Sequence, residues 1–451
     1  MQKIRNFWFA LRSSLWFVPG LMIAGSIILA LLLIDAESLV DREMLLKYPR
    51  LFGLGADGSR GMLTAIASSM LTVAALAFSL TLAALAQASA QYSPRILRNF
   101  MRDRINQFVL GYFVSVFAYC LIVLRTIRGA NDLEFVPALA VMGGLILAIG
   151  GIVVLIYFIH HIATSLQVSE IIGNIVDETR EAVETLFPKE MGKPAEKPEK
   201  TEAQIIETYK YWRKIPAQAS GYIQYVDTDQ LTEWAQENGF IVKMERGIGQ
   251  FVGKGAALVS LTGEEQSFKQ KITDETEDEI NNVFSINRYR TIEQDIGFGI
   301  RQIVDIALKA LSPGINDTTT AVTCIDFLSI IISEIAGKQL PEPVRIKDGK
   351  ICVLVKADDF RQYVETAFDQ IRINGKANQA IFQRLLEALK FVAENTQKKN
   401  RLAIVGEQIN LIGEFAEQTL QTEYEKKKVK VNLQEARSSV NEFGMSPISL
   451  T

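Results

Sequence analysis

Hydrophobic and polar positions divide the 451-residue chain into two unlike parts. Four long apolar segments, at about 15–34, 62–86, 108–124 and 135–159, contain no Asp, Glu, Lys or Arg. Because a helix needs about 20 apolar residues to cross about 30 Å of hydrocarbon, these segments predict four membrane spans. The third segment is the shortest of them. Residues 1–161 are therefore expected to form a transmembrane domain.

The pattern changes several times after the fourth apolar segment. Apolar positions first continue at helical spacing, which predicts a helical extension over 162–187. Three prolines with alternating Lys and Glu then predict a flexible linker at 188–203. Period-two stretches predict a β-module over 204–272, and helical periodicity with one hairpin predicts an α+β domain over 273–425. A charged, mobile tail is expected at 426–451.

The glycine spacing at Phe251–Leu258 resembles the closing strands of biotinyl- and lipoyl-like barrel-sandwich domains. Lys243 lies too close to this pattern to be the modified lysine of such a carrier domain, so we expect no cofactor. The predicted fold class is a membrane protein in which a four-helix transmembrane domain is followed by a soluble α+β domain. The soluble domain is expected to contain a small barrel-sandwich-like β-module.

Charge and composition exclude several functional classes. The chain has 48 Lys and Arg against 51 Asp and Glu, with a net charge of −3 and no concentrated basic face, so no nucleic-acid partner is expected. Three scattered cysteines and two adjacent histidines offer no recognisable metal site. No GxSxG, P-loop or HExxH motif occurs, and we therefore expect a protein that is not an enzyme.

The distribution of Lys and Arg in the short loops indicates the orientation in the membrane. The loop between the second and third spans carries four arginines: Arg95, Arg98, Arg102 and Arg104. Together with a basic N-terminus, they predict that both termini and the hydrophilic half are cytoplasmic. We expect these arginines to fix the topology and contact lipid headgroups. The alternative is an anion-attracting ring at the inner mouth of a pore.

The second span carries a stripe of hydroxyl side chains. Thr64, Ser68, Thr72 and Ser79 fall within about 80° of one another on a helix, and the same segment is rich in alanine. One interpretation is packing within the chain, with each hydroxyl bonded to a carbonyl of its own helix. The other interpretation is that this helix lines a water-filled path in an oligomer.

His160 and His161 lie side by side at the end of the fourth span. The simpler interpretation is that they anchor the helix at the membrane interface. The alternative is a pH-sensing gate, because histidine titrates near neutrality.

A long motif begins at Glu293 and resembles the signature of a known family. Its parts are EQDIGFGIRQ at 293–302, DIAL at 305–308 and ALSPGIND at 310–317, and SPR at 93–95 accompanies it. The chain resembles, over nearly its whole length, a family of predicted bacterial inner-membrane proteins of unknown function. Thr318 stands where we expect proline in that motif. The resemblance implies a bacterial inner membrane and supplies no activity.

The last part of this motif predicts a break between two helices. Ser312, Pro313 and Gly314 stop one helix, and Asn316 or Asp317 caps the next through a side-chain acceptor. Cation binding by Asn316 and Asp317 is the alternative.

These observations favour an oligomeric inner-membrane pore for ions or small solutes, with the cytoplasmic domain as its vestibule or gate. The alternative is a membrane-anchored scaffold or sensor that binds a cytoplasmic partner protein. The expected partners are membrane lipids and further copies of the same chain.

Overall fold

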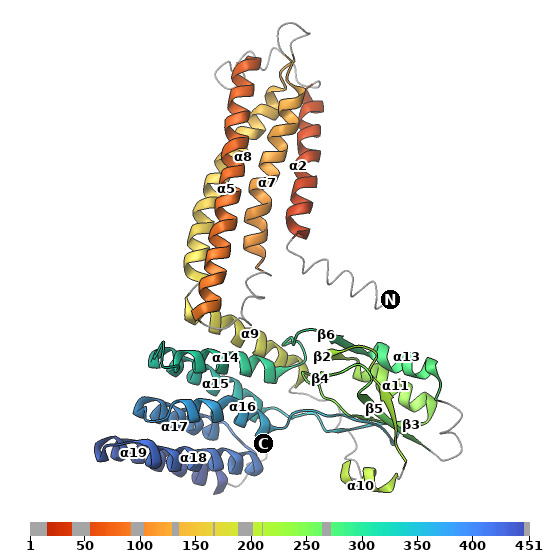
Figure 1. Ribbon diagram of the computed structural model, residues 1–451, viewed down its shortest axis with the longest axis vertical. Coiled ribbons are helices and arrows are strands. Elements are labelled where there is room, and N and C mark those ends of the chain that lie inside the picture. The colour runs from red at the N-terminus through yellow and green to blue at the C-terminus, as the bar shows by residue number, and fades with distance from the viewer. Residues whose placement is uncertain are drawn as a thin grey trace. The chain divides into compact units, whose positions relative to one another are not determined.

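The computed structural model describes residues 16–37, 55–91, 103–128, 135–165, 167–187, 202–209, 211–263 and 272–445. The chain forms two compact units, Met1–Glu170 and Ile171–Thr451 (Figure 1).

The first unit is a bundle of long apolar helices. They are α2 (Phe17–Ala36), α5 (Ala56–Gln91), α7 (Arg104–Thr126) and α8 (Ala138–Ser165). Each of them is long and apolar enough to cross a membrane, and each contains most of one predicted apolar segment. α7 packs against the other three helices, and its Val109, Phe113, Tyr119 and Cys120 are buried among them.

Glycine notches on α8 receive tyrosine side chains from α7. The Tyr119 hydroxyl donates to the Ala140 carbonyl at 2.7 Å, and a Cβ on Gly143 would lie 2.6 Å from that hydroxyl. Seven residues away the arrangement repeats, with Tyr112 donating to the Leu147 carbonyl at 2.8 Å beside Gly150. A larger residue at either glycine would collide with the ring, so the glycines set the separation of the two helices.

The second unit contains two small β-sheets. The five-stranded sheet has the order β1-β5-β3-β8-β7, and the three-stranded sheet has the order β4-β2-β6. The strands are β1 (Arg213–Pro216), β2 (Gly221–Val226), β3 (Phe240–Met244), β4 (Phe251–Val252), β5 (Ala257–Gly263), β6 (Phe284–Asn287), β7 (Val344–Lys347) and β8 (Lys350–Leu354). Helices α10 (Glu202–Thr208), α11 (Thr228–Asn238) and α13 (Asp274–Val283) accompany them.

The sheets extend beyond the β-module predicted at 204–272. The hairpin of β7 and β8, which we assigned to the helical domain, joins the larger sheet because β8 pairs in parallel with β3. β6 likewise completes the smaller sheet by pairing with β2. Because these strands lie far apart in the sequence, no local sequence pattern indicates that they pair. The likeness to a barrel-sandwich stays a prediction.

Six further helices lie in layers beside the sheets (Figure 1). They are α14 (Ile296–Ala310), α15 (Thr318–Gly337), α16 (Phe360–Asn374), α17 (Gln379–Glu394), α18 (Lys399–Thr419) and α19 (Glu423–Met445). α15 packs against α14, α16 and α17. It is also a fifth helix that is long and apolar enough to cross a membrane.

Most of the predicted mobile tail is an ordered helix. α19 covers 423–445 and packs on α17 and α18. A Cβ on Gly413 of α18 would lie 2.7 Å from Leu433, and one on Gly406 would lie 3.4 Å from Val440. The spacing of these contacts shows an apolar stripe on α19 that its many charged residues conceal. The tail predicted at 426–451 is therefore helical over residues 426–445 and belongs to a packed helix.

Helix α9 (Val168–Leu186) docks on the helical layers through a glycine of the long motif. A Cβ on Gly299 of α14 would collide with the Thr179 side chain, which is fully buried. Arg180 lies one residue further on and pairs with Glu334 of α15 at 2.6 Å. The motif glycine thus allows α9, which follows α8 along the chain after two residues, to approach α14 closely.

Gly299→Ala is expected to lower the midpoint of thermal unfolding of the second unit, because the added methyl must displace Thr179. Overpacking of this kind costs about 1–3 kcal/mol. Gly173→Ala on α9 is the control, since a Cβ there meets nothing within 4 Å and alanine favours helix. When circular dichroism follows unfolding of the purified full chain, the midpoint should fall in Gly299→Ala and rise in Gly173→Ala. Equal midpoints would refute the close approach.

Candidate functional site

The part of α5 that the first unit leaves uncovered contains a stripe of small residues, which is flanked by large apolar side chains that are also exposed: Leu71, Leu76, Phe78, Leu80 and Leu82. The inner face of α5 packs against α7 and α8 through Leu63, Ala67, Met70 and Ala74, all of which are buried. The opposite face follows the helical repeat and is exposed along its whole length. It consists of Gly61, Ala65, Ser68, Thr72, Ala75, Ser79, Ala83 and Ala86, which we call the small face.

The outward faces of α2 and α8 differ from this small face. On α8 the exposed side chains include Ile149, Ile152 and Ile156, and on α2 they include Leu21 and Leu32. Large aliphatic side chains are the usual contact with lipid tails, whereas small residues allow close approach of another helix. Within the described part of the first unit, α5 therefore combines large side chains suited to lipid contact with one stripe that allows the close approach of another helix.

Three of the predicted hydroxyl residues lie on the small face, and Thr64 lies at its exposed edge. The Thr72 hydroxyl donates to the Ser68 carbonyl at 2.9 Å. This bond satisfies the hydroxyl donor within its own helix, and the oxygen can still accept a hydrogen bond from water. The packing and pore-lining interpretations of the stripe share this geometry, so it does not separate them.

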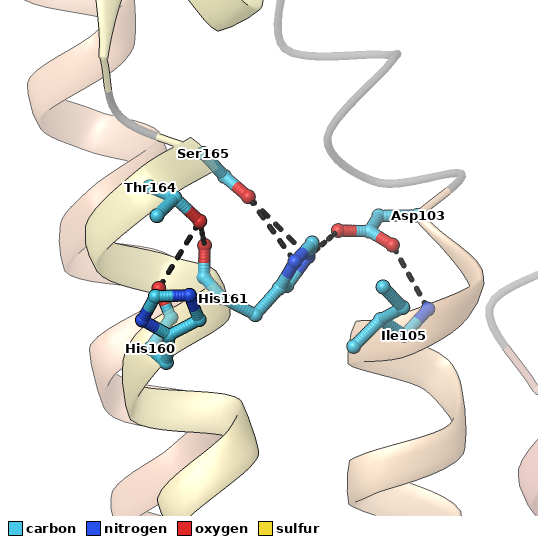
Figure 2. Close-up of polar contacts among 6 residues, drawn as sticks. All are labelled: Asp103, Ile105, His160, His161, Thr164 and Ser165. Carbon is cyan, nitrogen blue, oxygen red and sulfur yellow. Dashed lines mark hydrogen bonds and ion pairs between the residues drawn. The ribbon is translucent and has the colours of Figure 1, made fainter.

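A second polar site joins the ends of α7 and α8 (Figure 2). The Nε2 atom of His161 lies 2.5 Å from Oδ2 of Asp103. Oδ1 of the same carboxylate accepts from the backbone N–H of Ile105 and thereby caps α7. The Ser165 hydroxyl lies within 3.4 Å of the imidazole nitrogens, and Tyr157 stacks on the ring. His161 thus holds the start of α7 through the capping carboxylate.

The neighbouring His160 makes no such contact. Its side chain is exposed, whereas that of His161 is partly buried. The Thr164 hydroxyl donates to the backbone carbonyls of both residues. The structure therefore separates two histidines that look equivalent in sequence, and of the two it is His161 that contacts Asp103.

A buried amide lies one helical turn inside this site. Asn106 is 9% exposed, and both polar atoms of its side chain lack a hydrogen-bond partner among the described residues. It shares a face of α7 with Phe113 and Cys120, which pack against α8 at Gly151 and Gly144. Unpaired buried amides are rare in proteins, and water is their usual partner.

One of the four predicted loop arginines lies within the described residues. Arg104 is the first residue of α7, and its side chain is exposed. Arg95, Arg98 and Arg102 lie outside the described residues. A shared arginine ring therefore stays a prediction.

The break predicted at the end of the long motif is present between α14 and α15. Ser312, Pro313 and Gly314 follow α14, and Asn316 adopts a positive φ of 51°. Asp317 then caps α15, accepting from the backbone N–H of Thr320 at 3.0 Å and from its hydroxyl. These hydrogen bonds, chiefly that of the hydroxyl, lower the pKa of Asp317. Asp317 therefore functions as a helix cap, and the described residues hold no group of three or more acids, His or Cys that could bind a metal.

The start of the motif forms an ion pair that the sequence did not predict. Asp295 is 5% exposed, caps α14 through the Phe298 N–H, and pairs with both Nε and Nη2 of Arg290 at 2.7 and 2.9 Å. Arg290 also lies over the Phe298 ring. A Cβ on Gly249 would collide with this carboxylate, so the loop before β4 packs directly on the pair. The motif therefore joins the sheets to the helical layers.

Asp358 lies close to the same ion pair, next to Gly297. Partial removal from water raises its pKa, and the charge on Asp295 raises it further, while Arg290 opposes both effects. Among the described residues, no group of three or more His, Cys or acids forms here that could hold a metal ion. The cluster joins the start of α14 to the loop before α16.

The membrane-type helices agree with the comparison to known sequences. Residues 12–391 match the family described as "Predicted membrane protein (DUF2254)". The chain belongs to this family. Its predicted membership of a family of membrane proteins of unknown function is thereby confirmed.

Relatives of this DUF2254 chain occur in mycobacteria. Uncharacterized proteins of Mycobacterium tuberculosis and Mycobacterium bovis are each 32% identical to it over 410 residues. These alignments cover 89% of this chain and 76% of each relative. No solved structure matches the chain.

Two structural contacts in this DUF2254 chain escaped sequence analysis. The bond between Asp103 and His161 joins residues 58 positions apart, and the pair of Arg290 and Asp295 depends on a local turn. The sequence offered only an acid directly before a span and an acid near a predicted helix start, and both are common at helix caps.

Asp317→Ala is expected to destabilise the second unit by about 1 kcal/mol, the usual cost of losing a cap. Because the folded pKa is lowered, the contribution of Asp317 is present above its unfolded value of about 3.9 and is lost as the pH falls through the folded value. Asp317→Asn is the control, since asparagine caps without titrating. Unfolding midpoints measured between pH 3 and pH 7 should show the difference from alanine shrinking in acid. A difference independent of pH would contradict the role of the carboxylate.

His161→Ala is expected to increase hydrogen exchange at the first amides of α7, because Asp103 loses its second partner. In the double variant with Asp103→Asn, exchange at these amides should be little faster than in either single variant, because both changes remove the same contact. His160→Ala is the matched control and should leave exchange at 104–110 unchanged. Additive effects of the two changes would show that the contact contributes nothing.

Proposed function

We propose that the chain assembles through α5 into an oligomeric pore in a bacterial inner membrane, with this helix lining a path for ions or small solutes. The observation that carries the proposal is the small face of α5. It extends from Gly61 to Ala86 and therefore covers about 38 Å at 1.5 Å per residue. That length exceeds the roughly 30 Å of the hydrocarbon layer.

A small face of this length is a poor lipid contact. Residues such as Ala75 and Ser79 contribute few carbon atoms to contacts with lipid tails, whereas the isoleucines of α8 contribute many. Around an axis of several subunits, small side chains allow neighbouring α5 helices to approach, and hydroxyls such as that of Ser68 can face water. The absence of acids and bases from this face favours passive conduction over proton-coupled transport.

Four spans and cytoplasmic termini complete the proposal. α15 is apolar enough for a fifth span, but Asp326 pairs with Arg384 of α17 and Glu334 pairs with Arg180 of α9. Burying both ion pairs in lipid would be costly, so we assign α15 to the soluble domain. The soluble domain would then serve as vestibule or gate, without enzymatic activity or a cofactor.

Thr72→Phe is expected to abolish single-channel current in planar bilayers while leaving the mass of the detergent-solubilised oligomer unchanged, because the ring fills the path. Ile152→Phe on the outward face of α8 is the matched control, and it should conduct like the unaltered protein. Conduction that survives Thr72→Phe would remove α5 from the lining.

Cysteine labelling tests the same face when the pore is closed. Cys120, Cys324 and Cys352 are buried, so an introduced cysteine can be labelled selectively. At a pore lining, Thr72→Cys reacts with a charged, membrane-impermeant thiosulfonate, and Ile152→Cys does not. Oxidative cross-linking at position 72 without labelling would indicate a dry subunit interface. Neither reaction would support a scaffold whose spans serve only as an anchor.

A further inference from the structure

A polar pocket of about 540 Å³ lies at one end of the helical layers in the second unit. Three parts of the chain form its walls: the loop between α14 and α15, the loop between α16 and α17, and the start of α19. The lining residues are Leu311, Asn316, Asn374, Gly375, Lys376, Ala377, Asn378, Gln379, Ala380, Gln383 and Glu425. The family motif thus contributes one wall of the pocket.

Amide side chains dominate the chemistry of this pocket. Asn374 and Gln379 use their amide nitrogens to donate to the Gln370 carbonyl and to Oε1 of Gln383, which leaves their own oxygens as acceptors. Asn316 retains both its donor and its acceptor groups, since it forms no side-chain hydrogen bond with the described residues. Leu311 is the only large apolar residue in the lining, and this composition disfavours a lipid or another apolar ligand.

One cation and one anion also line the pocket, and they come from different walls. Lys376 belongs to the loop before α17 and forms no ion pair with the described residues. Glu425 belongs to α19, and its Oε2 accepts from the backbone N–H and hydroxyl of Thr422, which leaves Oε1 available. The pocket therefore offers both signs of charge without net charge.

The three helices that begin at the pocket do not make it an anion site. Asp317 caps α15, and Asn378 caps α17 by accepting from the backbone N–H groups of Ala380 and Ile381. At the start of α19, the Thr422 hydroxyl accepts from the backbone N–H of Glu425. All three helix ends thus already have side-chain acceptors. A ligand must be recognised by the lining side chains instead.

We propose that this pocket binds a small zwitterion of the amino-acid class. Lys376 would bind the carboxylate, Glu425 would bind the ammonium group, and the amides would bind a polar side chain. The volume lies within the range of roughly 300–1,000 Å³ that is usual for small-molecule sites. The protein would thereby sense a polar solute through its family motif, independently of any role of α5.

Isothermal titration of the purified full chain in detergent tests this proposal with L-glutamine as the probe. Acetate and ethylammonium each carry one of its two charges and serve as comparisons. We expect saturable heat for glutamine and at least tenfold weaker binding of either comparison ligand. Acetate binding as tightly as glutamine would show a simple anion site and overturn the proposal, as would the absence of saturable glutamine binding.

Charge-removing variants connect the binding to this pocket. Lys376→Gln and Glu425→Gln are each expected to weaken glutamine binding at least tenfold, and glutamine at 425 can still accept from Thr422. Lys428→Gln and Glu423→Gln, which alter charges on α19 outside the lining, are the controls and should bind like the unaltered protein. Unchanged affinity in Lys376→Gln and Glu425→Gln would place the ligand elsewhere. Because conductance is not measured, failure of the pore proposal would not affect the result.

Discussion

The packing of the first unit depends on the contact between two tyrosines of α7 and the glycines of α8. Each tyrosine ring fills the space that a glycine leaves, and its hydroxyl bonds to a carbonyl one turn earlier on α8. In lipid, the burial of apolar surface contributes little to the association of helices. Close packing and hydrogen bonds such as these must therefore stabilise the bundle. Gly144 and Gly151 continue the same face and accommodate Leu63 and Met70 of α5. With α7 and α8 fixed in this way, α5 is left with one face free.

Within the second unit, one short motif joins the sheets, the helical layers and α9. Asp295 ends the connection from the sheets and begins α14, Arg290 holds its carboxylate, and Gly249 allows the β3–β4 loop to approach. One turn later, Gly299 receives α9. The motif thus positions Arg290, the β3–β4 loop and α9 within a few residues. Hydrophobic burial alone would require neither a glycine nor a buried acid at these positions, and the three contacts explain both.

Sequence reasoning succeeded where the determining interactions are local. Hydropathy located the apolar helices, and the break after Ser312, Pro313 and Gly314 was predicted with Asn316 or Asp317 as the cap, of which Asp317 is the one observed. It failed where partners are distant. The parallel pairing of β3 with β8, the docking of α19 and the bond between Asp103 and His161 all join segments whose proximity only the folded chain reveals.

The composition of α15 has a consequence for biosynthesis. A 20-residue segment with mean hydropathy of 1.6 resembles a span to the machinery that inserts nascent helices into membranes. Asp326 lies near its middle, where an aspartate disfavours insertion by about 2.5–3.5 kcal/mol. If α15 belongs to the soluble domain, as we propose, the carboxylate that pairs with Arg384 in the folded state would also disfavour insertion of the emerging chain, before any tertiary contact exists.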